Sequence, residues 1–201
     1  MKVAIGSTLS EVFSAFQLPM TFGPICAKVN NKVEGMHFRV YHNKDVEFLD
    51  MHSASASRNY TRTLFFVLCK AVHDCYPKSY VVIDIPVSNG YFVNVDLGRP
   101  LEAADITRIR ERMQAIIDAR MPVRRFEVTT EAAVEMFRTR GDEAKAKLLE
   151  SSGKLYTTYY QIDDYVDFYY GSLLTNTSQL YLFGLEPYFD GLLLRIPSLD
   201  N

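Results

Sequence analysis

The sequence of residues 60–96, YTRTLFFVLCKAVHDCYPKSYVVIDIPVSNGYFVNVD, decides the fold class. Apolar residues recur at helical spacing through residues 64–75, which predicts a helix over 60–75. Residues 80–85 and 91–96 are rich in β-branched and aromatic side chains, which predicts two strands. Ser88-Asn89-Gly90 lies between them, and Asn-Gly supplies the positive φ of a tight hairpin. A helix followed by an antiparallel hairpin favours an α+β fold.

The downstream sequence continues this mixed pattern. Predicted there are a helix over 105–120, a strand over 123–128, a helix from Thr129 or Thr130 to Arg140, and a short helix over 143–150. The helix over 105–120 has a stripe of five residues expected to be buried: Ile106, Ile109, Met113, Ile116 and Ile117. Beyond Leu155, aromatic and β-branched residues predict several antiparallel strands, with turns near Asp163-Asp164, Gly171, Asn176 and Gly184. The second half should therefore be an α/β sandwich with an antiparallel sheet.

The first 50 residues have the pattern of a small sheet around one helix. Residues 3–5 favour a strand, and Thr8 with Glu11 forms a capping box ahead of a short helix. Short strands are expected over 25–29, up to Val40 and over 46–49. Residues 51–59 are small and polar, which is typical of a linker. We therefore predict a first domain over 1–51, a linker over 52–59 and a second domain over 60–198.

Composition narrows the function classes. The chain has 201 residues, of which 48% are hydrophobic and 23% charged, so it is neither collagen-like nor disordered. Its net charge of −2 argues against a globally basic nucleic-acid binder. Three cysteines without a CxxC spacing favour a reducing, cytoplasmic setting. The chain contains no apolar run long enough to span a membrane and no signal-type opening, so we expect no membrane partner.

Several short motifs resemble known modules. Residues 6–12, 27–31 and 45–48 resemble a TGS domain, the β-grasp module of threonyl-tRNA synthetases and some GTPases. Residues 60–197 resemble the editing-type second domain of threonyl-tRNA synthetase, through residues 70–77, the long helix that ends at residues 121–123, and residues 167–177. A pair of modules of this kind also precedes the kinase domain of a bacterial family of uridine kinase-like nucleoside kinases, whose signature blocks resemble residues 60–64, 168–171, 182–188 and 191–197.

The kinase resemblance implies an accessory region, in cis to a kinase domain that uses ATP and Mg²⁺. This chain itself has no G-x-x-x-x-G-K-[ST] loop, so it should not transfer phosphate and should need no cofactor. The roles implied are regulation, sensing of RNA or a small-molecule effector, or formation of a homo-oligomer. The alternatives are an RNA-binding or tRNA-editing-related protein and an enzyme with a new active site around Arg62, Tyr169 and Tyr170, in the cleft that holds the metal site of the editing-type domain.

The editing-type resemblance also implies positions for metal ligands. They fall on Arg62 and Phe66 of the predicted helix and on Tyr169 and Leu173. None of these side chains supplies the N or S ligand that zinc prefers, so we expect no metal. Arg62 could instead bind a carboxylate or phosphate in a cleft lined by Asp167, Tyr169 and Tyr170, or pair with an acid such as Asp167 and fill the old pocket.

Basic residues are concentrated in residues 108–125, where six arginines face only Glu111 and Asp118. The candidate nucleic-acid patch consists of Arg108, Arg112, Arg120, Arg124 and Arg125. Such a patch suits RNA phosphates, although a solvated helix face gives the same pattern. The tyrosines of residues 156–170 could stack on bases or belong to a half-buried sheet. Asp163-Asp164 more often marks a turn than an acid–base pair.

Overall fold

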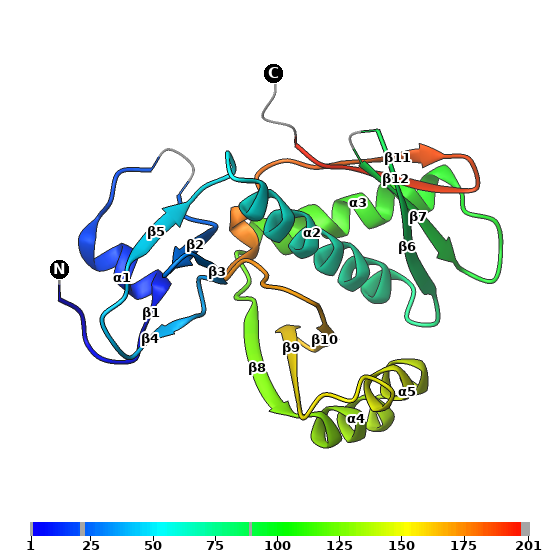
Figure 1. Ribbon diagram of the computed structural model, residues 1–201. Helices are drawn as coiled ribbons and strands as arrows, with labels where there is room; N and C mark the ends of the chain where they lie inside the picture. The colour runs from blue at the N-terminus through cyan, green and yellow to red at the C-terminus, as the bar shows by residue number, and fades with distance from the viewer. Residues whose placement is uncertain (1, 21–22, 89, 198–201) are drawn as a thin grey trace. The chain divides into compact units, whose positions relative to one another are not determined.

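The computed structural model describes residues 2–20, 23–88 and 90–197 and has an α+β fold with antiparallel sheets, which confirms the predicted class (Figure 1). The chain divides into two compact units. The main unit comprises Met1–Pro122 and Gly171–Asn201, and the inserted unit is Val123–Tyr170. Asn89 of the predicted hairpin turn, and residues 1, 21, 22 and 198 of the predicted domains, lie outside the described residues. None of the described helices is long and apolar enough to cross a membrane.

The N-terminal part, residues 2–50, packs one helix against short strands. Its elements are β1 (Ser7–Thr8), α1 (Leu9–Phe16), β2 (Cys26–Val29), β3 (Lys32–Gly35), β4 (Arg39–Val40) and β5 (Val46–Leu49). The sheet order is β3-β2-β5, and β1 pairs separately with β4. The predicted capping box is present, because Glu11 N donates to Thr8 Oγ1 at 3.2 Å and Thr8 N to Glu11 Oε2 at 2.7 Å. Leu9 is fully buried in the core of this part, and the β-grasp assignment stays a prediction.

The predicted strand over residues 3–5 is wrong. Residues 5 and 6 form a turn, in which Ser7 N donates to Ala4 O at 3.2 Å and Gly6 has a φ of 84°. Ile5 is 83% exposed, so no sheet face buries it. Strand pairing starts only at Ser7, opposite Val40.

Helix α2 (Ala54–Cys75) begins earlier than predicted, because Ser53 accepts a hydrogen bond from Ser55 N and caps it. Most of the residues expected to form the linker are therefore helical. Whether the division near residue 52 separates two domains stays a prediction. The later half of α2 is apolar and buried, and α2 packs along α3 (Ala103–Asp118). All five residues of the predicted stripe on α3 are buried, as expected.

A four-stranded antiparallel sheet completes the main unit. It contains β6 (Tyr80–Val87), β7 (Gly90–Asp96), β11 (Gly184–Tyr188) and β12 (Gly191–Arg195), in the order β11-β12-β7-β6. The predicted hairpin of β6 and β7 is present, and the C-terminal hairpin lies beside β7 (Figure 1). A Cβ at Gly90 would lie 2.5 Å from Leu194 O, so the contact of β7 with β12 requires glycine there.

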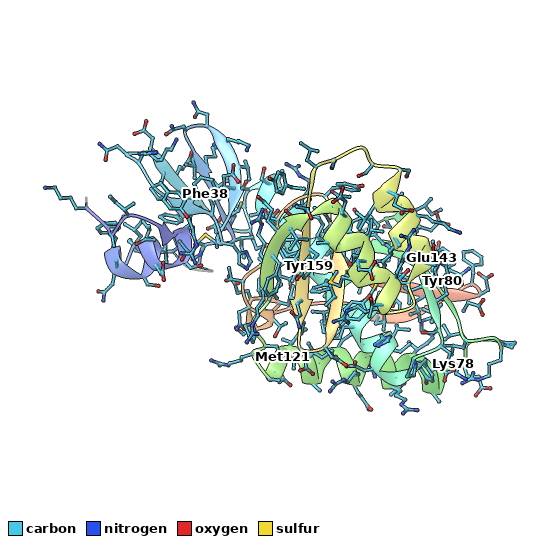
Figure 2. The ribbon with its side chains drawn as sticks, turned by 90° about the horizontal axis from the view of Figure 1, so that it is seen from below. Phe38, Lys78, Tyr80, Met121, Glu143 and Tyr159 are labelled. Carbon is cyan, nitrogen blue, oxygen red and sulfur yellow. The ribbon has the colours of Figure 1, made fainter. Side chains whose placement is uncertain are left out.

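The inserted unit has its own sheet and core. Its elements are β8 (Arg124–Thr129), α4 (Thr130–Thr139), α5 (Glu143–Glu150), β9 (Tyr156–Ile162) and β10 (Tyr165–Phe168). Phe137, on α4, is only 1% exposed and packs with Leu149 and Val166. Tyr159, labelled in Figure 2, lies on β9 and stacks on Phe126 at 5.0 Å between ring centroids. The turn predicted at Asp163-Asp164 is present, with Asp163 at a φ of 55°.

Residues 171–183 form no strand, although several antiparallel strands, separated by turns, were expected beyond residue 155. They contain only a short 3₁₀ helix, η1 (Thr177–Gln179). Their polar groups bond instead to the backbone just after α3: Thr177 N donates to Met121 O at 3.0 Å, and Asn176 Nδ2 donates to Arg120 O at 2.8 Å. Because these groups already have partners, the segment needs no ladder of strand hydrogen bonds.

Candidate functional site

Arg62, the residue expected to replace a metal ligand, lies in the polar first half of α2, residues 54–63. Its Nε donates to Ser172 O at 3.2 Å, and its guanidinium also bonds to Asn59 Oδ1. Gly171 has a φ of 120°, and a Cβ there would lie 2.7 Å from Arg62 Cζ. The guanidinium is therefore held against the backbone of residues 171–172, where only glycine leaves room for it.

Three α2 side chains, Asn59, Arg62 and Thr63 at positions i, i+3 and i+4, hold residues 172–174 against the helix. Besides Arg62, Asn59 Nδ2 donates to Ser172 Oγ at 2.8 Å, and Leu174 N donates to Thr63 Oγ1 at 2.9 Å. Asn59 is 1% exposed and Thr63 is fully buried. Burial strengthens these hydrogen bonds and makes their loss costly. Sequence reasoning missed Asn59, Thr63 and Ser172; the one available signal was the polar character of Asn59 and Thr63 at helical spacing.

Two further residues expected in the cleft are core residues. Phe66 on α2 and Leu173 are both fully buried and apolar. Neither offers an atom that binds a cation or an anion. Their place in the main unit is explained by packing.

Asp167, Tyr169 and Tyr170 belong to the inserted unit. Asp167 Oδ2 pairs with Lys145 Nζ at 3.1 Å, and Asp167 Oδ1 accepts a hydrogen bond from Phe168 N at 2.8 Å. Burial raises the pKa of Asp167, although Lys145 opposes this shift. Tyr170 is 64% exposed, and Lys154 Nζ lies 4.3 Å from the centroid of its ring. A cleft formed by these residues and Arg62 would draw on both units, and it stays a prediction.

The described residues contain no group of three or more His, Cys, Asp or Glu side chains placed to hold a metal ion. His52, in the predicted linker, contacts Asp50 Oδ1 through Nδ1 at 3.0 Å. The prediction of a site without metal stays a prediction.

The arginines of the candidate patch have different surroundings. Arg112 is paired with Asp74 at 2.7 Å, and Asp74 also pairs with the buried Lys70 at 3.2 Å. Arg125, in the inserted unit, pairs with Glu127 at 2.9 Å. Ion pairing reduces the positive charge that these two arginines offer to an external anion.

The other members of the patch, Arg108, Arg120 and Arg124, have exposed side chains. Arg108 Cζ lies 5.4 Å from the centroid of the Tyr76 ring. The ring carries no negative charge, so this contact does not neutralise the guanidinium of Arg108. Arg108 and Arg120 belong to the main unit and Arg124 to the inserted unit. The main unit therefore carries two exposed arginines of the predicted patch.

Comparison with known proteins places the chain beside one class of enzyme. It is 25% identical over 178 residues to the threonine–tRNA ligase of Desulforamulus reducens, covering 88% of this chain and 28% of the relative. It is 27% identical over 177 residues to that of Syntrophomonas wolfei, covering 87% and 28%. The chain is similar to threonine–tRNA ligases. For Clostridium perfringens the identity is 25% over 168 residues, covering 83% and 26%. No family model matches.

These relatives support the synthetase resemblance and overturn the kinase reading. The chain spans about a quarter of the length of the curated relatives that it matches. Those relatives are threonine–tRNA ligases, so the prediction of an accessory region of a uridine kinase-like nucleoside kinase is wrong. The expectations of a kinase domain in cis, ATP and Mg²⁺ lose the resemblance on which they rested.

Proposed function

We propose that this chain is a tRNA-binding region that binds its RNA without metal-dependent hydrolysis at the Arg62 site. The observation that carries the proposal is the similarity to threonine–tRNA ligases along 88% of the chain. A match of this extent includes both the N-terminal part and α2 with its surroundings. RNA binding is therefore a property expected of the whole region.

The chemistry of the Arg62 site favours binding over hydrolysis. At the positions that the resemblance assigns to metal ligands, Phe66 and Leu173 are buried apolar residues. Zinc requires N, S or O donors, so these two positions supply none. A guanidinium, in contrast, binds phosphate or carboxylate with two parallel hydrogen bonds. Arg62, which stands at another of the metal-ligand positions that the resemblance assigns, therefore suits an anionic ligand.

The exposed arginines of the main unit supply a second contact with RNA. Arg108 and Arg120 are exposed, and within the part of the chain that the structure describes no acidic side chain pairs with either of them as Asp74 pairs with Arg112. Arginine at a surface gains free energy from phosphate by releasing counterions, and this makes the affinity depend on salt. The net charge of −2 implies that such binding is local.

Fluorescence anisotropy with labelled tRNA and the full chain tests this proposal. The double variant Arg108→Ala, Arg120→Ala should bind about tenfold more weakly and lower the salt slope by about two, because two phosphate contacts are lost. The matched control is Arg138→Ala, which removes an exposed arginine of α4 that pairs with Glu150. The affinity of Arg138→Ala for tRNA should equal that of the unchanged chain. Equal losses in both variants would contradict the assignment of the surface.

A deacylation assay tests the second half of the proposal. Mischarged threonine-accepting tRNA incubated with the chain should lose its amino acid no faster than in buffer, with or without added Zn²⁺. Accelerated hydrolysis that disappears in Arg62→Ala would overturn the non-hydrolytic assignment.

A further inference from the structure

One face of the four-stranded sheet points away from the helices. Tyr91 packs its ring on that of Phe65 in α2, at 4.8 Å between centroids, so positions 91, 93 and 95 of β7 face the core. Because side chains alternate along a strand, positions 92, 94 and 96 face the other way. With the residues beside them in register they form the outer face, which comprises Tyr80, Val82, Val87, Phe92, Asn94, Asp96, Glu186, Tyr188, Leu193 and Arg195.

The outer face is rich in apolar side chains, whereas a sheet face turned toward water is ordinarily polar. Tyr80 and Val82 are exposed on β6, and Ile85 is exposed in the bulge of β6 opposite Phe92. The rings of Phe92 and Tyr188 lie 6.1 Å apart between centroids. Exposed apolar side chains gathered on one face mark a surface that binds another molecule.

The row of rings continues into the turn between β11 and β12 (orange to red in Figure 1). Phe189 packs its ring edge-on against Tyr188 at 4.7 Å between centroids, yet Phe189 is 90% exposed. Its φ of 49° lies in the left-handed region, which favours glycine or asparagine over an aromatic residue. The turn therefore holds a residue that suits neither its backbone nor its contact with water. Binding of a partner accounts for both features.

The charge of the sheet identifies the kind of partner. Its four strands and the turn between β11 and β12 contain four acidic residues and one basic residue, a net charge of −3: Asp84, Asp96, Glu186, Asp190 and Arg195. The basic residue, Arg195, is already paired with Glu186. Acidic groups repel phosphates, so the outer face disfavours nucleic acid although aromatic rings stack on bases. Lysine and arginine side chains, in contrast, are attracted both by carboxylates and by the faces of aromatic rings.

The two edge strands of the sheet hinder the addition of a further strand. Strand β6 contains Pro86 and a bulge between Ile83 and Pro86, and β11 contains Pro187. Proline and bulges at the edge of a sheet interfere with pairing to another strand. A partner is therefore expected to lie across the outer face. A helix can do so because its backbone hydrogen bonds are already made within the helix.

We propose that the outer face, with Phe189 at its end, binds a basic amphipathic helix of a partner protein. The apolar side of that helix packs on the exposed apolar side chains of β6 and on Phe92. Its lysines and arginines contact the acidic residues of the sheet, and Phe189 is the aromatic anchor at one end. This proposal concerns a protein partner and does not depend on the binding of tRNA.

Fluorescence anisotropy with two labelled peptides and the full chain tests the chemistry of the partner. One peptide consists of leucine and lysine, with leucine at helical spacing, and the matched control peptide has glutamate in place of every lysine. The lysine peptide should bind at least about tenfold more tightly, because only its charges complement the acidic residues of the sheet. Equal or tighter binding of the glutamate peptide, or no binding of the lysine peptide at about 1 mM, would overturn the proposal.

Substitution of Phe189 locates the binding surface. Phe189→Gly should weaken binding of the lysine peptide about tenfold, because it removes the aromatic anchor. Its midpoint of urea denaturation should be unchanged or higher, because glycine suits the positive φ of the turn. The matched control is Leu155→Ser, which removes an exposed apolar side chain of the inserted unit and should leave the affinity unchanged. A lowered midpoint in Phe189→Gly, unchanged affinity in that variant, or equal losses in both variants would overturn the proposal.

Two further measurements separate the other possible occupants of the outer face. Labelled oligouridine should bind Phe189→Gly as it binds the unchanged chain; an affinity that falls in this variant would assign the outer face to nucleic acid instead. Sedimentation of the chain should likewise give the same oligomeric state with and without Phe189→Gly. Self-association that this substitution abolishes would assign the outer face to a second copy of the chain and overturn the proposal.

Discussion

Replacing Tyr60 with phenylalanine should weaken the main unit through one oxygen atom. Tyr60 lies on α2 and is fully buried; its hydroxyl donates to Leu182 O at 2.6 Å and accepts from Leu182 N at 3.0 Å. Burial raises the pKa of Tyr60, so the hydroxyl keeps its proton and remains a donor. Phenylalanine keeps the ring and its contact with Tyr181, at 5.4 Å between centroids.

The cost follows from the two backbone groups that lose their partner. An unsatisfied buried group costs about 1–3 kcal/mol, and a hydrogen bond contributes about 1 kcal/mol net. The side chain of Leu182 is 57% exposed, so water can replace part of what is lost. We therefore expect Tyr60→Phe to lower the free energy of unfolding by about 1.5 kcal/mol.

Urea denaturation of the full chain measures this change, with an unchanged m-value. The matched control is Tyr80→Phe, which removes the same atom from a side chain that is 66% exposed. Its effect should stay within about 0.5 kcal/mol. Equal effects of the two variants would refute the role given to the buried hydroxyl.

Three further predictions concern stability. Asp105→Asn breaks the two-pronged contact with Arg99, at 2.7 and 2.8 Å, and should cost about 2 kcal/mol in urea denaturation at pH 7. Arg99 holds the pKa of Asp105 well below its usual range, so this stabilisation is complete above about pH 4 and is lost as the pH falls further; an Asn variant that loses as much stability in acid as the unchanged chain would contradict this. Phe137→Ala should lower the free energy of unfolding of the inserted unit by about 3 kcal/mol, measured by calorimetry of the full chain, because it leaves a cavity where a side chain that is only 1% exposed was packed. Lys145→Met leaves the Asp167 carboxylate without its cation and should cost about 2 kcal/mol; a stabilised variant would show that the pair is dispensable.

The sequence was sufficient for elements whose burial follows a regular period. The apolar stripe of α3 and the hairpin of β6 and β7 have long, clear patterns, and both are present. The capping box at Thr8 was also predictable, because all its partners lie within one turn. Local signals of this kind do not depend on the rest of the chain.

Elements decided by distant contacts were missed. Residues 54–59 have the composition of a linker, yet they belong to α2, and Asn59 is buried against Ser172. Residues 171–183 have the composition of strands, but their polar groups bond to Thr63, Met121 and Arg120. Partners of this kind lie more than 50 positions away in the sequence, so neither periodicity nor propensity identifies them.

The candidate site was predictable only in its central residue. The resemblance identified Arg62, and the structure adds Asn59, Gly171 and Ser172 around it. The glycine could not be identified from sequence, because its requirement arises from a guanidinium that lies against it in space. The role of the site as an RNA contact stays a proposal.

One competition titration tests the central claim most directly. Labelled tRNA bound to the full chain is displaced with unlabelled tRNA or with duplex DNA of the same number of phosphates, at fixed salt. If the chain is a tRNA-binding region, unlabelled tRNA should compete at least about tenfold better than the DNA, because contacts beyond the phosphates then contribute. Equal competition by both, or no binding of tRNA at micromolar concentrations, would contradict the account.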